Sequence, residues 1–447
     1  MTIPYSVLRM LIALVLMTVG SSAMYVVVVV LPMVQSEFGV DRADASLPYT
    51  LTMMGFGLGG ILMGRLSDRY GVSVPVMVGG VGMTLGFWLA ATAPALWVFT
   101  AAHGILLGLL GSSAMFAPLV ADTSLWFTKR RGIAVAICAS GNYLAGAVWP
   151  PIVQSFSAVH GWRAAYLTMA VISLVIIVPL SFLLRRRAPL ADAMAGATVA
   201  QRPGNALKAA VERSRTAARA AADTASGAAA VRAGASAPAS ASAEERPLGM
   251  SLGALQSLLF VAGISCCIAM SMPQVHIVAL CGDLGFGVAR GAEMLSLMLA
   301  FGILSRLTSG LICDRIGGLR TLLLGSVLQA VALLLFLPFD SLASLYVISA
   351  LFGLVQGGIV PSYAIIVREY FSPREAGARV GTVLMATLLG MAIGGWVSGK
   401  IFDLTGSYDA AFIHGFAWNA LNAAIAFYLL MRARRVGPTL TPSAVLA

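Results

Sequence analysis

The sequence predicts an all-α membrane protein with twelve transmembrane helices in two six-helix bundles. Its composition points to the membrane, because 59% of the 447 residues are hydrophobic and only 11% are charged, whereas a soluble chain carries about 25% charged residues. Apolar segments near the roughly 20 residues that a helix needs to cross a bilayer recur along the chain. A charged turn that occurs once in each half indicates that the two bundles are repeats of one unit.

The apolar segments are separated by short charged turns or turns that contain Gly or Pro. In the first half they cover residues 8–33, 46–65, 74–93, 96–120, 132–155 and 163–184, which places an N-terminal bundle at 1–184. In the second half they cover residues 251–276, 293–312, 320–338, 342–367, 379–402 and 410–431, which places a C-terminal bundle at 251–431 and a tail at 432–447. The first segment is longer than the apolar region of about 7–15 residues in a signal peptide, so we expect it to be a retained helix.

The segment between the bundles, residues 185–250, has a different composition. It is rich in Ala, Arg and Ser and has almost no large apolar residues. Such a segment cannot bury a core, so we expect a disordered cytoplasmic loop that tethers the two bundles. A transient basic helix on anionic lipid, over residues 205–223, is the alternative.

The net charge of +11 is distributed in alternate loops. Of the 29 Lys and Arg residues, the intervening loops hold only Arg42, Arg163, Arg290 and Lys400. This is the positive-inside pattern, and it predicts a multi-pass protein of the inner or plasma membrane with both termini in the cytoplasm. The charge therefore orients the chain in membrane lipid, and we expect no nucleic-acid partner. We expect a monomer.

The repeated turn has the pattern Gly-x-x-x-Asp-Arg-x-Gly. It reads GRLSDRYG at residues 64–71 and GLICDRIG at 310–317. Two further matches occur at nearly the same separation: FTKR at 127–130 with FSPR at 371–374, and Pro32 with Pro273. Three matches in register are typical of two related bundles.

The chain resembles the major facilitator superfamily over almost its whole length, the central segment and the tails excepted. In that family two six-helix bundles enclose a site near the middle of the membrane and rock about it. The resemblance implies that the repeated turn is a conformational latch between the halves on the cytoplasmic side. Its residues here are Gly64, Asp68, Arg69 and Gly71, and in the second copy Gly310, Asp314, Arg315 and Gly317. The alternative is an Asp-Arg pair that only anchors each loop in the headgroups.

Arg306 is the most informative single residue. It lies about 13 residues into the eighth segment, or roughly 20 Å along a helix. An arginine at such depth costs at least about 2.5–3.5 kcal/mol on insertion scales, so it needs a reason. One interpretation is a cation that faces a central cavity and binds an anionic substrate. The other is a structural arginine that snorkels or pairs with a neighbouring helix.

The sequences RLTSG at 306–310 and WFTKRRGIA at 126–134 are similar to the monocarboxylate and oxalate/formate transporters of the superfamily. The resemblance implies that Arg306 holds the substrate carboxylate. Gly302 stands where proton-coupled members often carry an aspartate, and residues 26–30 and 381–399 lack the basic residue of several members. A single buried cation fits a monoanion better than a dianion. The glycine argues against proton coupling through an arginine–aspartate pair in this helix.

Other polar residues inside the segments are weaker candidates. Five of them could line the cavity and bind substrate, or could bridge helices through hydrogen bonds: Tyr25, Asn142, Tyr143, Gln356 and Tyr363. His103 could relay protons, or it could be a neutral side chain packed between helices. His276 lies near the outer end of its segment, where it could be a gate residue or solvated.

The predicted function is secondary active transport of a small organic anion, a monocarboxylate, by proton symport or anion exchange. No nucleotide-binding loop, nucleophile elbow or metal-ligand spacing occurs in the sequence, so we expect no enzyme activity, no cofactor and no metal. An exporter of apolar drugs or siderophores is one alternative. A sensor on the same fold that does not transport is another.

Overall fold

The computed structural model describes residues 5–127, 131–186 and 247–436. Within these residues the chain forms helices and no strand. By their contacts the two bundles form one compact unit. The predicted loop at 185–250 and tail at 432–447 lie largely outside the described residues, as do residues 128–130 of the WFTKRRGIA motif.

Twelve helical segments of the described chain are long and apolar enough to cross a membrane, which confirms the predicted number. In the N-terminal half they are built from α1 (Tyr5–Gly20) with α2 (Ser22–Phe38), α3 (Arg42–Tyr70), α4 (Ser73–Ala91), α5 (Leu96–Ala101) with the π-helix η1 (Ala102–Ser112) and α6 (Ala117–Trp126), α7 (Arg131–His160) and α8 (Trp162–Leu183).

The C-terminal half begins with a short 3-10 turn, η2 (Pro247–Gly249). Its six spans are α11 (Leu252–Asp283), α12 (Val288–Ile316), α13 (Gly318–Leu335), α14 (Leu342–Gln356) with α15 (Ile359–Tyr370), α16 (Pro373–Thr405) and α17 (Asp409–Val436). Most of the spans extend past the apolar segments by several residues, because the helices continue through the polar residues at their ends.

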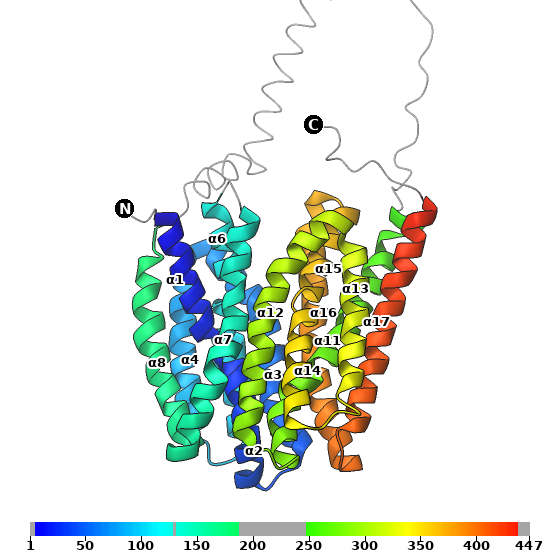
Figure 1. Ribbon diagram of the computed structural model, residues 1–447. Coiled ribbons are helices and arrows are strands. Elements are labelled where there is room, and N and C mark those ends of the chain that lie inside the picture. The colour runs from blue at the N-terminus through cyan, green and yellow to red at the C-terminus, as the bar shows by residue number, and fades with distance from the viewer. Residues whose placement is uncertain (1–4, 128–130, 187–246, 437–447) are drawn as a thin grey trace, which may run out of the picture. The chain divides into compact units, whose positions relative to one another are not determined.

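The two ends of the bundle can be told apart by the chain termini (Figure 1). α1 begins, and α8 and α17 end, at the end drawn at the top. We call this end the terminal face, and both copies of the repeated turn lie there. The opposite end, with the connections 39–41, 284–287 and 406–408, is the loop face.

The repeated turn has the same backbone in both halves. Gly71 has φ 85° and ψ 163°, and Gly317 has φ 83° and ψ 163°. The amide of each glycine donates to the carbonyl four residues earlier, at 2.8 Å in both copies. A positive φ is strained for any residue with a Cβ, so the turn requires glycine at these two positions.

Three of the twelve spans are interrupted near their middles. The first breaks at Ser21, the fourth passes through η1 and a turn before α6, and the tenth breaks at Gly357 and Gly358. At these breaks the chain comes close to a neighbouring helix: a Cβ on Gly20 would collide with the side chain of Met115, and one on Gly357 would stand 2.9 Å from the Cβ of Ser305. Interrupted helices inside a membrane are tolerated where they are buried in protein or line a cavity.

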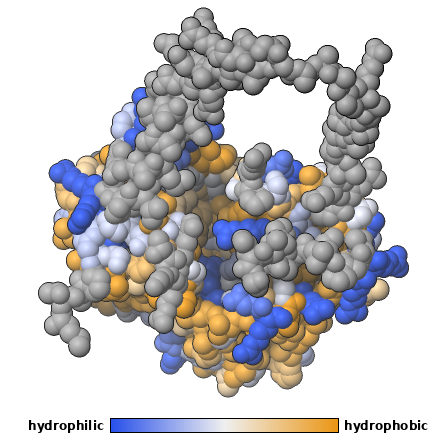
Figure 2. Space-filling model, turned by 90° about the horizontal axis from the view of Figure 1, so that it is seen from above, coloured by the Kyte–Doolittle hydropathy of each residue, from blue (hydrophilic) through white to orange (hydrophobic). Residues whose placement is uncertain are grey.

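The two halves pack through α3 against α16 and α7 against α12. Near the loop face and the middle the first pair is tight, since a Cβ on Gly57 would stand 2.8 Å from the sulfur of Met385. Toward the terminal face, Gly64 on α3 and Gly377 and Gly381 on α16 have no atom within 4 Å of such a Cβ. Figure 2 looks onto the terminal face and shows it hollowed between the halves, with hydrophilic residues in the hollow. The halves therefore meet at the loop face and part toward the terminal face.

Candidate substrate site

Arg306 lies on α12 where this helix faces α7 of the other half. Its Nη1 donates to the carbonyl of Ala139 at 3.1 Å, and its guanidinium carbon lies 4.4 Å from the centre of the Tyr143 ring. Its Nε is buried without a hydrogen-bond partner. Among the described residues no carboxylate forms an ion pair with it. The guanidinium thus spans the contact between the halves with its charge uncompensated.

Two glycines shape the space around this arginine. A Cβ on Gly302, one turn before Arg306, would stand 2.7 Å from the Tyr143 ring. A Cβ on Gly357, at the break in the tenth span, would stand 3.1 Å from the backbone nitrogen of Arg306. The space that an aspartate side chain would need at position 302 is therefore filled by Tyr143. An aspartate at this position would collide with the Tyr143 ring unless the ring moved.

Tyr25 and Asn142 form a hydrogen-bonded pair on the N-terminal side of the site. The hydroxyl of Tyr25 donates to Oδ1 of Asn142 at 3.0 Å, and Nδ2 of Asn142 donates to Oγ of Ser21 at 3.2 Å. Ser21 is the residue at which the first span breaks. The Tyr25 ring packs against α7 at Gly146, where an added Cβ would stand 2.8 Å from this ring and would collide with Leu299 of α12. The structure therefore joins Tyr25 of α2 to Asn142 of α7, the residue before Tyr143, whose ring contacts Arg306.

Gln356 ends α14, immediately before the break at Gly357. Its Oε1 accepts from Nε2 of Gln274 at 2.7 Å, while its own Nε2 is fully buried without a partner. Gln274, on α11, is a neighbour that sequence reasoning missed, because nothing in its surroundings distinguishes it from other polar residues in apolar spans. An unpaired buried amide is costly, so this donor is a candidate for a substrate oxygen.

Tyr363 has a different position. Its hydroxyl donates to Oδ1 of Asn422 at 2.7 Å, and Asn422 donates in turn to Oγ of Ser326. These residues lie in the packed interior of the C-terminal bundle, with Ile366 and Leu322. The structure thus places Tyr363 in a bridge between α15, α17 and α13, away from the contact between the halves.

The charged residues of the repeated turn make few contacts in this conformation. In the described residues, Asp68, Asp314 and Arg315 have no hydrogen bond or ion pair, and Arg69 only stacks on the neighbouring Tyr70 ring at 5.3 Å. Next to the second copy of the turn, Glu369 forms a hydrogen bond: its Oε1 accepts from the amide of Gly318 at the start of α13. In the part of the chain that the structure describes, the charged residues of the predicted latch therefore form no bond between the halves.

The loop face is closed by a set of residues around Arg42, which we call the Arg42 cluster: Arg42, His276, Asp283, Asp403 and Tyr408. Nη1 and Nη2 of Arg42 donate to the two oxygens of Asp283 at 3.1 Å each, and Nη1 also donates to the Tyr408 hydroxyl at 2.9 Å. The backbone amide of Arg42 donates to Asp403 at 2.8 Å. The N-terminus of α3 is thereby held by α11, α16 and the 406–408 connection of the other half.

Two more contacts continue this closure. The backbone amide of Ala43 donates to the second oxygen of Asp403 at 2.9 Å, and Oγ1 of Thr50 donates to the carbonyl of Ala392 at 3.1 Å. In the sequence Arg42 is notable only as a rare basic residue of a loop that the charge pattern predicts to be non-cytoplasmic, and that rarity is the one signal of its role. The partners Asp283 and Asp403 are ordinary helix-end carboxylates in the sequence.

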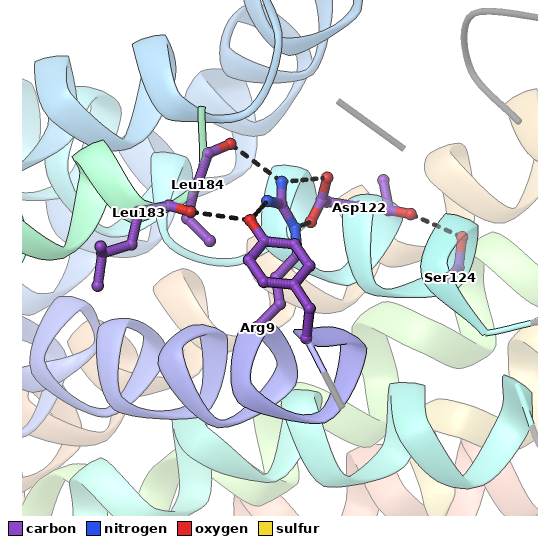
Figure 3. A network of polar contacts seen from close by, with 7 residues as sticks. Arg9, Asp122, Ser124, Leu183 and Leu184 are labelled. Atoms are coloured by element: carbon purple, nitrogen blue, oxygen red, sulfur yellow. Dashed lines mark hydrogen bonds and ion pairs between the residues drawn. The ribbon is translucent and has the colours of Figure 1, made fainter. Parts of the chain in front are cut away.

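A second buried ion pair lies at the terminal face, within the N-terminal half (Figure 3). Nε and Nη2 of Arg9 donate to the two oxygens of Asp122 at 2.7 and 2.9 Å, and Nη2 also donates to the carbonyl of Leu184 at 3.1 Å. The guanidinium lies 4.9 Å from the centre of the Trp126 ring. This pair joins α1, α6 and the end of α8, so it stabilises one half rather than the contact between the two.

Comparisons with known proteins agree with the fold. The chain is 25% identical over 355 residues to monocarboxylate transporter 13 of Bos taurus, covering 78% of this chain and 71% of that protein. Its fold is similar to the crystal structure of the nucleoside transporter NupG, with a TM-score of 0.66, 13% identity, and coverage of 96% of this chain and 100% of that one.

It is also similar to a bacterial homologue of the human lysosomal transporter Spinster in an inward-facing and occupied conformation, with a TM-score of 0.65, 13% identity, and coverage of 99% of this chain and 100% of that one. The family model of the Major Facilitator Superfamily matches residues 10–273 and again residues 259–445. These matches span both six-helix halves, and the proteins found are transporters rather than enzymes. The chain belongs to the Major Facilitator Superfamily.

Proposed function

We propose that the chain is a secondary active transporter that carries a small organic anion, a monocarboxylate, with Arg306 as the anchor of the substrate. The observation that supports this most is the state of that side chain. A guanidinium with a buried, unpartnered Nε lies between the two halves, and no described carboxylate neutralises it. Because burial of an unpaired charge is costly, the site favours an anionic ligand that supplies the missing partner.

The neighbours of Arg306 suit a carboxylate that carries one further polar group. The guanidinium offers a planar fork of donors. Tyr143, whose ring lies beside the guanidinium, and Gln356, whose Nε2 is buried without a partner one residue before the break at Gly357, offer further hydrogen-bonding groups. Lactate and pyruvate have an oxygen next to the carboxylate that these groups can bind, and their single charge matches the single cation. We therefore include Tyr25, Asn142, Tyr143 and Gln356 in the proposed substrate site, and we treat Tyr363 as structural.

The arrangement of the two faces supports transport by alternating access. The Arg42 cluster closes the loop face, while α3 and α16 part toward the terminal face. The terminal face carries the basic loops, so the positive-inside rule places it in the cytoplasm of an inner or plasma membrane. In this assignment the structure is the state open to the cytoplasm. The repeated Asp-Arg turns then latch the cytoplasmic side in the opposite state.

The main test of this proposal measures the uptake of labelled lactate, pyruvate, formate and oxalate into vesicles that contain the purified protein. Arg306→Gln should abolish saturable uptake, and Arg306→Lys should raise KM because it keeps the charge but loses the fork. Arg290→Gln is the matched control, since Arg290 lies on the same helix but is exposed and forms its ion pair with Glu293 of its own half.

The outcomes separate the proposal from its rival. Saturable acid uptake that survives Arg306→Gln would remove Arg306 from the site. Uptake or efflux of uncharged hydrophobic dyes, with no response to any acid, would favour the exporter.

A further inference from the structure

The closed loop face contains a buried histidine at its centre. His276, on α11, is fully buried, and both ring nitrogens have partners. Nε2 lies 2.8 Å from the carbonyl of Gly395, and Nδ1 lies 3.1 Å from the hydroxyl of Tyr408. The same hydroxyl lies 2.9 Å from Nη1 of Arg42. His276 is thus joined through one tyrosine to the arginine that holds the two halves together.

These contacts fix which atom carries each proton along the hydrogen bonds that link Gly395, His276, Tyr408 and Arg42. A carbonyl only accepts, so Nε2 of His276 carries a hydrogen and donates to Gly395. An arginine only donates, so the oxygen of Tyr408 accepts from Arg42 and its own hydrogen points to Nδ1 of His276. Burial raises the pKa of Tyr408, which keeps this hydroxyl protonated. The closed loop face therefore holds His276 as a neutral imidazole.

A proton on Nδ1 costs this arrangement the hydrogen bond that Tyr408 donates to His276. The oxygen of Tyr408 would then face two donors, and its own hydrogen would lose its acceptor. Neither nearby carboxylate binds the imidazole directly in the described residues. Asp283 is bound to the guanidinium of Arg42, and both oxygens of Asp403 accept from backbone amides at the start of α3, so the charge of Asp403 offsets only part of the repulsion between Arg42 and a charged imidazole. A charged imidazole would also repel Arg42, so protonation opposes the contacts of Tyr408 and of the Arg42 guanidinium that help to close the loop face.

We propose that His276 is a proton-binding site that controls the loop face: it takes a proton when this face opens, and the bound proton holds the face open. A ligand that binds one of two states shifts the equilibrium toward that state. A tenfold difference in proton affinity between the states changes the ratio of open to closed protein about tenfold. Acid on the loop side thus exposes the substrate site to that side. The inference rests on alternating access in the proposed function but not on the anionic substrate.

The experiment measures the opening of the loop face directly as a function of pH. Spin labels are placed on the exposed positions Asp44 of α3 and Leu404 of α16, one in each half, by cysteine substitution. The five native cysteines are buried, which favours labelling at the introduced ones. Distances between the labels are recorded from pH 8 to pH 5, the range in which imidazole titrates. We expect a longer-distance population that grows about tenfold on acidification.

His276→Asn should remove this response, because its Oδ1 can still accept from Tyr408 but cannot take a proton near neutral pH. His103→Asn is the matched control: His103 is equally buried, with partners Thr52 and Tyr166 on its two nitrogens, but it lies inside the N-terminal half. It should keep the parental pH response.

Tyr408→Phe gives an independent check if His276→Asn does not fold. It leaves the imidazole in place but breaks its link to Arg42, so the pH response should weaken. A parental response in both His276→Asn and Tyr408→Phe, or no response in the parent, would overturn the proposal. The readout uses no substrate, so a failure to transport acids in the Arg306 experiment leaves this test intact.

Discussion

The two faces of the molecule use charge in opposite ways. At the loop face, Arg42 is buried and binds Asp283 and Tyr408 of the other half. At the terminal face, Asp68 and Arg315 of the repeated turns make no hydrogen bond or ion pair in the described residues. The repeated Asp-Arg turn is the most visible pattern in the sequence, but the Arg42 cluster, rather than this turn, holds the halves together in this conformation. A recurring motif marks the family, whereas the state of the transporter depends on which charges are paired between the halves.

The largest energetic effect is expected at a buried pair that does not join the halves. Arg9 and Asp122 have side chains only 3% and 12% exposed. Removal of one partner of such a pair costs about 3–5 kcal/mol, because the other charge stays buried. Arg9→Gln should therefore lower the thermal unfolding temperature strongly in detergent. The label distance across the loop face should not change, because all contacts of Arg9 lie within one half; a change in that distance would contradict this assignment.

A smaller effect, but on a different quantity, is expected at Arg42. Its partner Asp283 has a side chain 37% exposed, so the pair lies between the buried and exposed cases and should contribute about 2–3 kcal/mol. Since this energy separates the two conformations, Arg42→Gln should shift the ratio of open to closed loop face about 30- to 150-fold toward open.

The label pair described above measures this shift. Arg290→Gln, on the same face but with an exposed partner in its own half, should leave the ratio unchanged. An Arg42→Gln variant that stays closed would show that apolar packing, rather than the Arg42 cluster, closes the loop face.

The contrast between the faces also shows what a sequence can predict. Twelve apolar segments and two turn glycines follow from local chemistry, and the structure shows both. The depth of Arg306 in its span likewise follows from the sequence alone, since it needs only a count along one helix. The Arg42 cluster could not be found in this way, because its members come from four helix ends or connections that are distant in the chain. The break at Gly357 was also missed, since a glycine pair in an apolar span equally indicates close helix packing.

The third prediction concerns the proposed substrate site, which lies between the two faces. A Gly302→Ala variant tests whether Tyr143 positions the substrate there. Gly302→Ala places a Cβ 2.7 Å from the Tyr143 ring, so the ring must move from its place beside Arg306. Overpacking of this kind costs about 1–3 kcal/mol, and the part of this cost that falls on the substrate-bound state raises KM for the acid, by up to about 150-fold. Gly60→Ala is the control, because no atom lies within 4 Å of its Cβ. An unchanged KM in Gly302→Ala would show that Tyr143 does not position the substrate.

The smallest effect on this conformation is expected at the repeated turns. Because Asp68 and Asp314 have no partner in the described residues, Asp68→Asn and Asp314→Asn should each change the unfolding temperature by less than the equivalent of about 0.5 kcal/mol, as at most surface positions. If the turns latch the cytoplasmic side in the opposite state, the same variants should still slow transport, since they weaken only that state. Unfolding temperature and uptake rate would then separate, in contrast to Arg9→Gln, whose effect is on stability. Uptake at the parental rate in both aspartate variants would show that the repeated turns fix loop geometry through Gly71 and Gly317 and do not act as a latch.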